Sequence, residues 1–418
     1  MVVTLYYSIL LILIVNFIFD RWLDYLNTTK LSSVLPLELQ DIYDAEKYQK
    51  SIAYEKIKHR FATISESLGF IAILTLFATG SFGILDRFVR VWVNNPIHVA
   101  LLYFGILGLL SEILSFPFKY YHTFVIEAKF GFNKTTRPLF LLDQLKGLII
   151  ATILGGSILY LIVWIYLISG SLFWLYALAV IASFSVFMLL FYSNIIVPLF
   201  NRQTSLADGE LKEAITAFSQ KAGFLLDNIY VIDGSKRSTK ANAYFTGLGS
   251  KKRIVLYDTL INELNTHEIV AVLAHEIGHY KKKHVYSGLF FSLISTALML
   301  YIFALVSGNP AFAQVLGSET AGFHLSVISF GILYTPLSLI IGLVMNYKSR
   351  FNEYQADHFA AQHYGSQYLA MALKKLSVSN LSNLTPHPFY VFFHYSHPTL
   401  LQRLQKLSEI RLVDVNRV

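Results

Sequence analysis

Residues 148–168 read LIIATILGGSILYLIVWIYLI, an apolar run of 21 residues without one charged side chain. A helix needs about 20 apolar residues to cross the roughly 30 Å hydrocarbon core of a bilayer. Seven stretches of the chain reach about that length, and their apolar residues are continuous instead of being confined to one helical face. The chain is therefore predicted to be a predominantly α-helical polytopic membrane protein with seven transmembrane helices.

Six of the seven predicted spans contain no Asp, Glu, Lys, Arg or His, whereas the third contains His98 and Glu112. A carboxylate inside a bilayer is costly, so Glu112 is expected to line a polar chamber or to hydrogen-bond a neighbouring helix. The first span lacks a basic n-region and a small-residue cleavage site, so it is expected to remain as a helix. The predicted spans are Val2–Phe19, Leu68–Leu85, Ile97–Phe116, Leu148–Ile168, Leu172–Tyr192, Val285–Val306 and Leu325–Met345.

The composition supports a membrane protein and excludes several kinds of site. Of the 418 residues, 55% are hydrophobic and only 14% are charged, against about 25% charged in an average soluble domain. The net charge of +8 is interpreted as basic cytoplasmic loops, and no nucleic-acid partner is expected. The chain has no cysteine, which excludes disulfides, Cys-ligated zinc, iron–sulfur clusters and a thiol nucleophile. Any bound metal must be held by His, Asp or Glu.

The orientation follows from the distribution of basic residues between the spans. Of the 34 Lys and Arg residues, 32 lie in the alternate segments 20–67, 117–147, 193–284 and 346–418. Basic loops stay on the cytoplasmic side, so we expect an outside amino terminus and a cytoplasmic carboxyl terminus. The two longest polar segments, 193–284 and 346–418, then share the cytoplasmic side.

The first long polar segment is predicted to be a small α+β module. Its predicted elements are a helix at Ala207–Gly223, strands at Asn228–Asp233, Ala241–Leu248 and Arg253–Tyr257 with a turn at Gly249-Ser250, and a helix at Glu268–Tyr280 with Thr266 as its N-cap. We divide the chain into 1–192 with five spans, 193–284 as the catalytic module, 285–346 with two spans, and 347–418 as the remainder of the catalytic module.

The helix at Glu268–Tyr280 contains the motif His275-Glu276-Ile277-Gly278-His279. Two imidazoles four residues apart project from one face and can share one zinc ion. Glu276 is offset by about 100° from His275, which suits a base acting on the metal-activated water. The alternative is that both histidines are merely hydrogen-bonded on a surface helix.

A catalytic zinc usually has three protein ligands, so one is still missing. The extended motif with a third histidine is excluded, because Lys282 and Val285 occupy the positions that would need Gly and His. The better candidate is Glu353, on a helix that follows the last span on the same side. Asp357, one turn later, could fix the tautomer of a ligand histidine. An exposed acidic helix face is the alternative interpretation of this pair.

The chain resembles the CAAX prenyl protease 1 family, the type I prenyl-protein endopeptidases. The similarity extends from about residue 36 onward and depends on several motifs together. They are His275–His279, Glu353-x-x-x-Asp357, Asn242-Ala243-Tyr244-Phe245, Ser396-His397-Pro398 followed by Arg403, and the loop Ile126–Thr135.

This resemblance implies a role for each matching residue. Glu353 would be the third zinc ligand and Asp357 its partner, within a gluzincin-like module on the cytoplasmic side of a ring of seven helices around a chamber. His397 and Arg403 would stabilise the oxyanion or brace the metal site. The strand containing Asn242, Ala243 and Tyr244 would pair with the substrate backbone. Plain structural roles are the alternatives for His397, in a Pro-bounded turn, and for Asn242, at a strand start.

The predicted activity is zinc-dependent peptide-bond hydrolysis by a chain that acts as a monomer with one Zn²⁺, Glu276 being the general base. Substrates would be prenylated CAAX carboxyl termini, as in eukaryotic members, or membrane proteins and peptides in quality control. The membrane would be the bacterial inner membrane or the endoplasmic reticulum. A seven-span transporter or channel with a regulatory zinc site is the alternative. His284, next to Lys281–Lys283, is expected only to anchor the sixth span at the interface.

Overall fold

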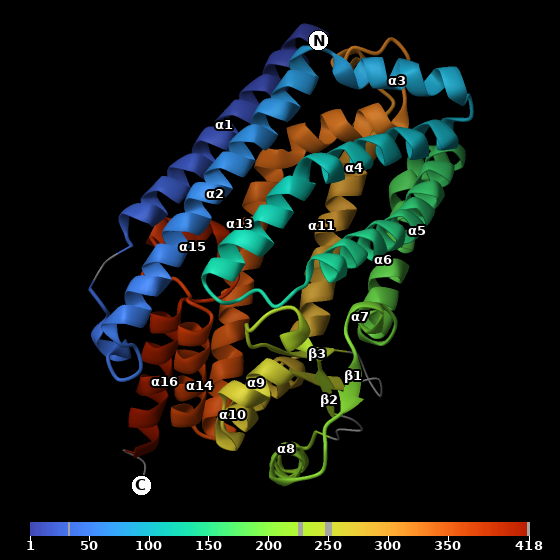
Figure 1. Ribbon diagram of the computed structural model, residues 1–418. Helices are drawn as coiled ribbons and strands as arrows, with labels where there is room; N and C mark the ends of the chain where they lie inside the picture. Colours follow the sequence, from blue (N-terminus) through green and yellow to red (C-terminus); the bar gives the residue numbers. More distant parts are fainter. Residues whose placement is uncertain (32–33, 225–228, 247–252, 416–418) are drawn as a thin grey trace.

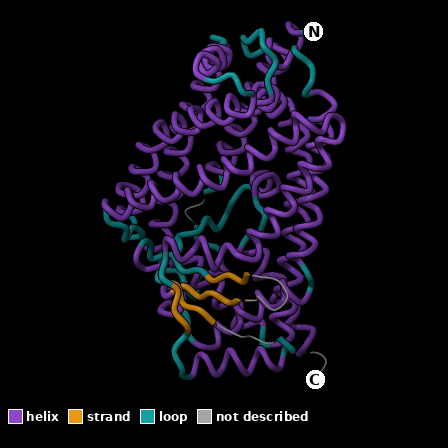
Figure 2. The backbone as a smooth tube through the Cα atoms, turned by 90° about the vertical axis from the view of Figure 1, so that its right-hand side faces the viewer, coloured by secondary structure: helices purple, strands orange, loops and turns teal. Residues whose placement is uncertain are grey.

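The computed structural model describes residues 1–31, 34–224, 229–246 and 253–415. Long helices form the upper part of the molecule, and a smaller module with a sheet and several helices lies below them (Figure 1). The amino terminus lies at the upper end and the carboxyl terminus at the lower end, while the strands are confined to the lower part (Figure 2). The architecture is therefore a helical membrane domain joined to an α/β module.

Among the described residues, six helical segments are long and apolar enough to cross a membrane. They are Val2–Thr29, Ala45–Ala78, Pro96–Glu127, Arg137–Phe200, His284–Val306 and Phe323–His363. The helices of this part are α1 (Val2–Thr29), α2 (Ala45–Ala78), α3 (Ser81–Trp92), α4 (Pro96–Tyr121) continued by a π-helical turn (His122–Glu127), α5 (Arg137–Ser169), α6 (Phe173–Phe191), α7 (Val197–Phe200), α11 (His284–Val306), α12 (Ala311–Gln314) and α13 (Phe323–His363).

The fourth of these segments, Arg137–Phe200, has 64 residues, about three times the length that one crossing needs. It contains two predicted spans, which correspond to α5 and α6. A 3-10 turn separates the two helices at Gly170, whose φ of 53° lies in the left-handed region. The helices α5 and α6 pack against each other. Six of the seven predicted spans therefore fall within these segments, two of them in this one, and the seventh, Leu68–Leu85, extends past the end of its segment.

The predicted second span, Leu68–Leu85, is wrong at its carboxyl end. Helix α2 ends at Ala78, and Gly80 adopts a left-handed conformation with φ 65° before α3 begins at Ser81. At Gly83, a Cβ atom would lie 2.1 Å from the carbonyl oxygen of Gly317. Apolar composition continues across this bend, so hydropathy alone could not locate it.

Glu112 on α4 forms an ion pair with Lys119 of the same helix, at 2.7 Å. Both residues line a large cavity between α4 and α5. The surface of this cavity is mostly apolar, so it is not the polar chamber that we expected, and the partner of Glu112 belongs to its own helix and not to a neighbouring one.

The lower module contains a four-stranded sheet in the order β1-β2-β4-β3. Strands β2 and β4 pair in parallel, while β1 and β3 add antiparallel at the two edges. The predicted strands at 228–233, 241–248 and 253–257 correspond to β2, β3 and β4, while residues 228, 247 and 248 and the predicted turn at Gly249-Ser250 lie outside the described residues. The elements are β1 (Gln203–Ser205), α8 (Glu210–Lys221), β2 (Ile229–Ile232), β3 (Ala243–Thr246), β4 (Arg253–Tyr257), α9 (Asp258–Glu263), α10 (Thr266–Lys281), α14 (Ser366–Ser379), α15 (Pro388–His394) and α16 (Leu400–Val415).

Two distant parts of the chain build the core of the module. Buried side chains from residues 206–277 pack in one cluster with buried side chains from 359–407. Helix α13 connects this cluster to the membrane domain, because its 41 residues extend about 60 Å, twice the thickness of the hydrocarbon core. Glu353 therefore lies on a continuation of the last membrane helix instead of on the separate helix that we expected.

The helix with the HExxH motif, α10, begins at Thr266, two residues before the predicted Glu268, and its N-cap lies one residue earlier than predicted. Asn265, not Thr266, is the N-cap: its side chain accepts from the Glu268 backbone N–H, while the Glu268 carboxylate accepts from the Asn265 N–H. This capping box satisfies two of the free N–H groups of the first turn. The helix ends at Lys281, because Lys283 adopts a left-handed conformation with φ 57°.

Candidate metal centre

Helices α10 and α13 cross closely at Gly278, the glycine within the HExxH motif. A Cβ atom at this position would lie 3.1 Å from the Cα and carbonyl oxygen of Ala356 and from the Cβ of Phe359. Ordinary contacts between carbon atoms are about 3.5–4.0 Å, so only glycine allows the observed spacing without a shift. The crossing brings one face of α10 against the turn of α13 that contains Glu353 and Asp357.

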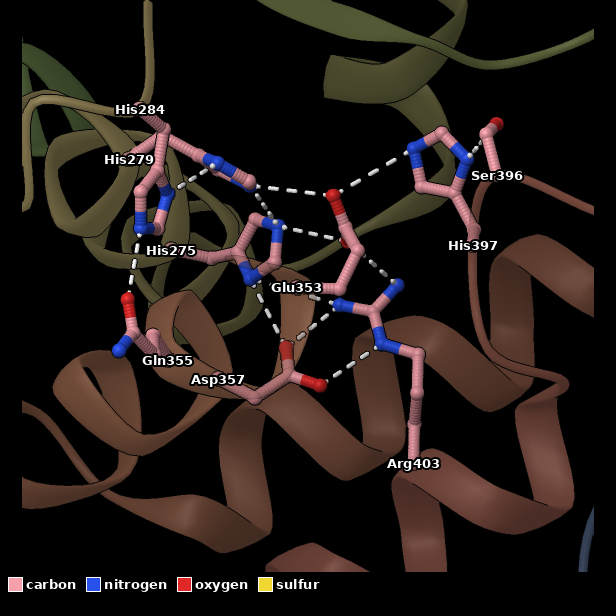
Figure 3. A network of polar contacts seen from close by, with 9 residues as sticks. All are labelled: His275, His279, His284, Glu353, Gln355, Asp357, Ser396, His397 and Arg403. Atoms are coloured by element: carbon pink, nitrogen blue, oxygen red, sulfur yellow. Dashed lines mark hydrogen bonds and ion pairs between the residues drawn. The ribbon is translucent and has the colours of Figure 1, made fainter. Parts of the chain in front are cut away.

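Three donor atoms converge where these faces meet (Figure 3). The Nε2 atoms of His275 and His279 are 3.1 Å apart. Each lies near the Glu353 carboxylate, at 3.4 Å for His275 and 3.2 Å for His279. One donor atom from each residue lies within 4.8 Å of the others, a spacing that one metal ion can bridge. Two imidazoles and a carboxylate are a donor set that suits zinc.

The His275 ring is oriented by Asp357 and, through it, by Arg403. Its Nδ1 lies 2.8 Å from Asp357, which also accepts two hydrogen bonds from the Arg403 guanidinium, at 2.5 and 2.8 Å. Burial alone would lower the pKa of His275, but hydrogen bonds to Asp357 and Glu353 outweigh it and raise the pKa to about 9. Because the Asp357 carboxylate can only accept, the proton on Nδ1 points to it, and Nε2 is the ring atom that faces the other two donors.

His279 has a partner that the sequence interpretation missed. Its Nδ1 lies 2.9 Å from Nδ1 of His284, whose Nε2 lies 2.9 Å from Oε1 of Gln355 on α13. On an uninterrupted helix, His284 would lie about 140° away from His279. The break at Lys283 instead starts α11 at His284 and turns its ring back towards the site. Expecting only an interfacial anchor here was wrong, because the bend at Lys283 turns the His284 ring towards His279.

His397 lies on the open side of the site, in the segment between α15 and α16. Its Nε2 lies 3.4 Å from the Glu353 carboxylate, and its Nδ1 lies 2.9 Å from the Ser396 hydroxyl. Its side chain is 63% exposed, whereas the side chain of Arg403 is only 13% exposed and is held by Asp357. Of the two residues, His397 is therefore the one that a ligand can reach.

A pocket of about 530 Å³ brings together eight of the ten predicted site residues; Tyr244 and Asp357 do not line it. Asn242, Ala243, His275, Glu276, His279, Glu353, His397 and Arg403 all line it. Tyr244 is the exception among the predicted substrate-binding residues. Side chains alternate along a strand, so Ala243 and Phe245 face the pocket, whereas the Tyr244 hydroxyl lies 3.4 Å from Ser193.

Among the described strands, β3 is an edge of the sheet, and it lies beside this pocket. The Tyr257 N–H donates to the Asn242 carbonyl, which sets the phase of the antiparallel ladder. Main-chain groups alternate in direction along such a ladder. Those of Ala243 and Phe245 therefore point away from β4, and the Ala243 N–H donates to Oδ1 of Asn242 at 2.9 Å.

Comparisons with known proteins give long matches. The chain is 37% identical to CAAX prenyl protease 1 of Saccharomyces cerevisiae over 95% of this chain and 94% of that protein. It is 36% identical to the CAAX prenyl protease 1 homolog of Arabidopsis thaliana, covering 95% of this chain and 96% of the relative. The crystal structure of S. mikatae Ste24p superposes with a TM-score of 0.90 at 36% identity, covering 96% of this chain and 98% of that chain.

A multi-pass helical fold with two histidines and a carboxylate in one pocket defines the class of membrane-bound metalloproteases. Two family models match successive parts of the chain: the CAAX prenyl protease N-terminal model, with five membrane helices, over residues 24–202, and peptidase family M48 over residues 205–411. The chain belongs to the CAAX prenyl protease 1 family. The resemblance noted from its motifs is confirmed, and none of these matches supports a transporter or channel.

Proposed function

We propose that the chain is a zinc endopeptidase in which His275, His279 and Glu353 hold the metal. The observation that carries this proposal is the convergence of their three donor atoms within 4.8 Å, with each imidazole hydrogen-bonded through Nδ1. A bound zinc ion would lower the pKa of water and polarise the scissile carbonyl. The spacing of the donors and the pocket beside them support this ligand set.

Glu276 is the proposed general base. Its carboxyl group lies in the same pocket as the donors, and no hydrogen bond or ion pair ties it to the described parts of the chain. It would take the proton from the attacking water and pass it to the leaving amine. His397, exposed in the same pocket, would donate to the carbonyl oxygen as negative charge develops. Arg403 would act as a brace, because its guanidinium is engaged with Asp357.

The substrate backbone would lie along the open edge of β3. The outward main-chain groups of Ala243 and Phe245 would pair with it, and Asn242 would contact it at the start of the strand. Such pairing reads the main chain more than the side chains. Tyr244 would contribute indirectly, by packing on the opposite face of the strand.

We further propose seven crossings, with α5 and α6 counted separately, an outside amino terminus, and a cytoplasmic carboxyl terminus and zinc site. The excess of Lys and Arg in alternate segments supports this orientation. The module then consists of 193–284 and 347–418, in line with its shared buried core. The chain would act as a monomer in the endoplasmic reticulum or a bacterial inner membrane.

The proposed substrates are prenylated CAAX carboxyl termini, since the relatives that match over nearly their whole length are named CAAX prenyl proteases. Membrane-associated peptides and proteins in quality control are the second substrate class. A large, mostly apolar cavity among the membrane helices is compatible with a lipid-modified peptide.

Hydrolysis of a farnesylated CAAX peptide by the purified, detergent-solubilised chain tests the proposal. The wild type should cleave it, and Glu276→Gln should lose at least 100-fold in kcat while retaining one zinc per chain. Glu263→Gln, on the exposed end of α9, is the matched control and should retain full activity. Equal cleavage by wild type and Glu276→Gln would contradict the proposed base.

The same peptide without the prenyl group separates the two substrate classes. Strict dependence on the prenyl group supports CAAX processing, whereas equal cleavage favours broader membrane peptides. Incubating the zinc-loaded Glu276→Gln form with a membrane extract and identifying retained peptides by mass spectrometry would name the physiological substrate. Retention of random soluble peptides would argue against both classes.

A further inference from the structure

His284 and Gln355 lie behind His279, on the side away from the other two donors (Figure 3). The His284 ring is 7% exposed and bridges Nδ1 of His279 and the Oε1 atom of Gln355, each at 2.9 Å. It comes from the first turn of α11, while Gln355 comes from α13. Three helices therefore meet in one short chain of hydrogen bonds that ends at His279.

The positions of the protons along this chain follow from the donor and acceptor rules. An amide oxygen only accepts, so Nε2 of His284 must donate to Gln355. In the neutral imidazole, Nδ1 of His284 is then an acceptor, so the proton between the two Nδ1 atoms belongs to His279. A neutral His279 with Nδ1–H has its lone pair on Nε2, the atom that faces Glu353 at 3.2 Å.

We propose that His284 and Gln355 are positioning residues that hold His279 in the tautomer a metal ligand requires. This inference rests on the proposed function, in which His279 binds the metal. The two ligand histidines would be oriented by different chemistry: a buried carboxylate for His275, and a neutral imidazole and amide for His279. Position 355 then decides the direction of the whole chain of hydrogen bonds. An acceptor there favours metal binding, and a donor opposes it.

Substitutions of Gln355 test this directly, with the zinc affinity of the purified full-length chain as the readout, measured by competition with a chromophoric chelator. Gln355→Glu keeps an acceptor and should bind zinc at least as tightly as the wild type. Gln355→Leu removes the acceptor and should bind about 5–10-fold more weakly. Gln355→Lys supplies only donors and should lose about 10–100-fold, the range for partners of metal ligands.

Two controls separate this role from charge and from folding. Gln362→Lys places the same charge two turns later on an exposed position of α13 and should bind zinc like the wild type. The unfolding temperature of each metal-free variant shows whether the fold is retained. Any variant that unfolds is replaced by His284→Ala, for which we expect a loss of about tenfold or more.

The outcomes distinguish the proposed positioning role of His284 and Gln355 from the proposed set of metal ligands. Weaker zinc binding by Gln355→Leu and Gln355→Lys, with the zinc affinity of Gln355→Glu unaffected, supports the positioning role. Wild-type zinc affinity in Gln355→Leu overturns the positioning role, because the charges introduced by Gln355→Glu and Gln355→Lys would then explain the affinities of those two variants. If Glu353→Gln binds zinc as tightly as the wild type, the proposed ligand set is wrong, and this outcome is independent of the affinities of the Gln355 variants.

Discussion

Replacing Gly278 by alanine should weaken metal binding without removing any ligand. The new methyl group would lie 3.1 Å from three atoms of α13, and relief to an ordinary contact of about 3.6 Å requires the helices to separate by roughly 0.5 Å. Coordination bonds to zinc are only about 2.0–2.2 Å long, so the separation is about a quarter of a bond length. The histidines are on one helix and Glu353 on the other, so the shift acts directly on the site.

The magnitude follows from two opposing effects. Alanine favours a helix interior by about 1 kcal/mol over glycine, whereas overpacking costs about 1–3 kcal/mol. The metal-free protein should therefore lose at most about 2 kcal/mol of stability. If bound metal draws the helices back together, it must overcome about 1–2 kcal/mol of strain, which weakens its affinity about 5–30-fold.

Zinc affinity by chelator competition and the unfolding temperature of the metal-free form are the two measurements. Gly288→Ala on α11 is the matched control, because a Cβ atom there meets nothing within 4 Å, and its zinc affinity should equal that of the wild type. Wild-type affinity in Gly278→Ala, with an unchanged unfolding temperature, would refute the argument that this close crossing sets the site.

Three other perturbations have distinct expected outcomes. Asp357→Asn leaves the buried Arg403 guanidinium without its charged partner, so the metal-free protein should lose about 3–5 kcal/mol of stability. An unfolding temperature within 1 °C of the wild type would contradict that ion pair. Ala243→Pro removes an N–H that points away from β4 and donates only to the neighbouring Asn242 side chain, so the fold should persist while kcat/KM for peptide falls at least tenfold; unchanged kinetics would argue against strand pairing by the substrate. Gly83→Ala forces a methyl group to 2.1 Å from a backbone oxygen far from the metal site, so it should lower the unfolding temperature by several degrees without changing zinc affinity. Gly69→Ala, with open space around it, should do neither, and a loss of zinc affinity in Gly83→Ala would disprove the separation of the two regions.

The local features of this protein could be predicted from its sequence because each depends on neighbouring residues. A continuous apolar run such as 148–168 can only be satisfied in lipid as a helix, whatever the rest of the chain does. The spacing of His275 and His279 places both rings on one helical face by geometry alone. Strand β4 was predicted at its observed bounds, because a short apolar run between turns indicates a strand.

For features that join distant residues, the sequence could only suggest candidate residues, and tertiary packing decided which of them come together. Glu353 reaches the histidines because α13 continues out of the membrane and crosses α10 at a glycine. Left-handed residues at Gly80 and Lys283 end helices within apolar or basic runs, where hydropathy gives no boundary. His284 therefore contacts His279 through a bend that periodicity cannot reveal. Helical and strand periods arise from steric rules between neighbours, whereas a shared site depends on which surfaces the whole chain buries together.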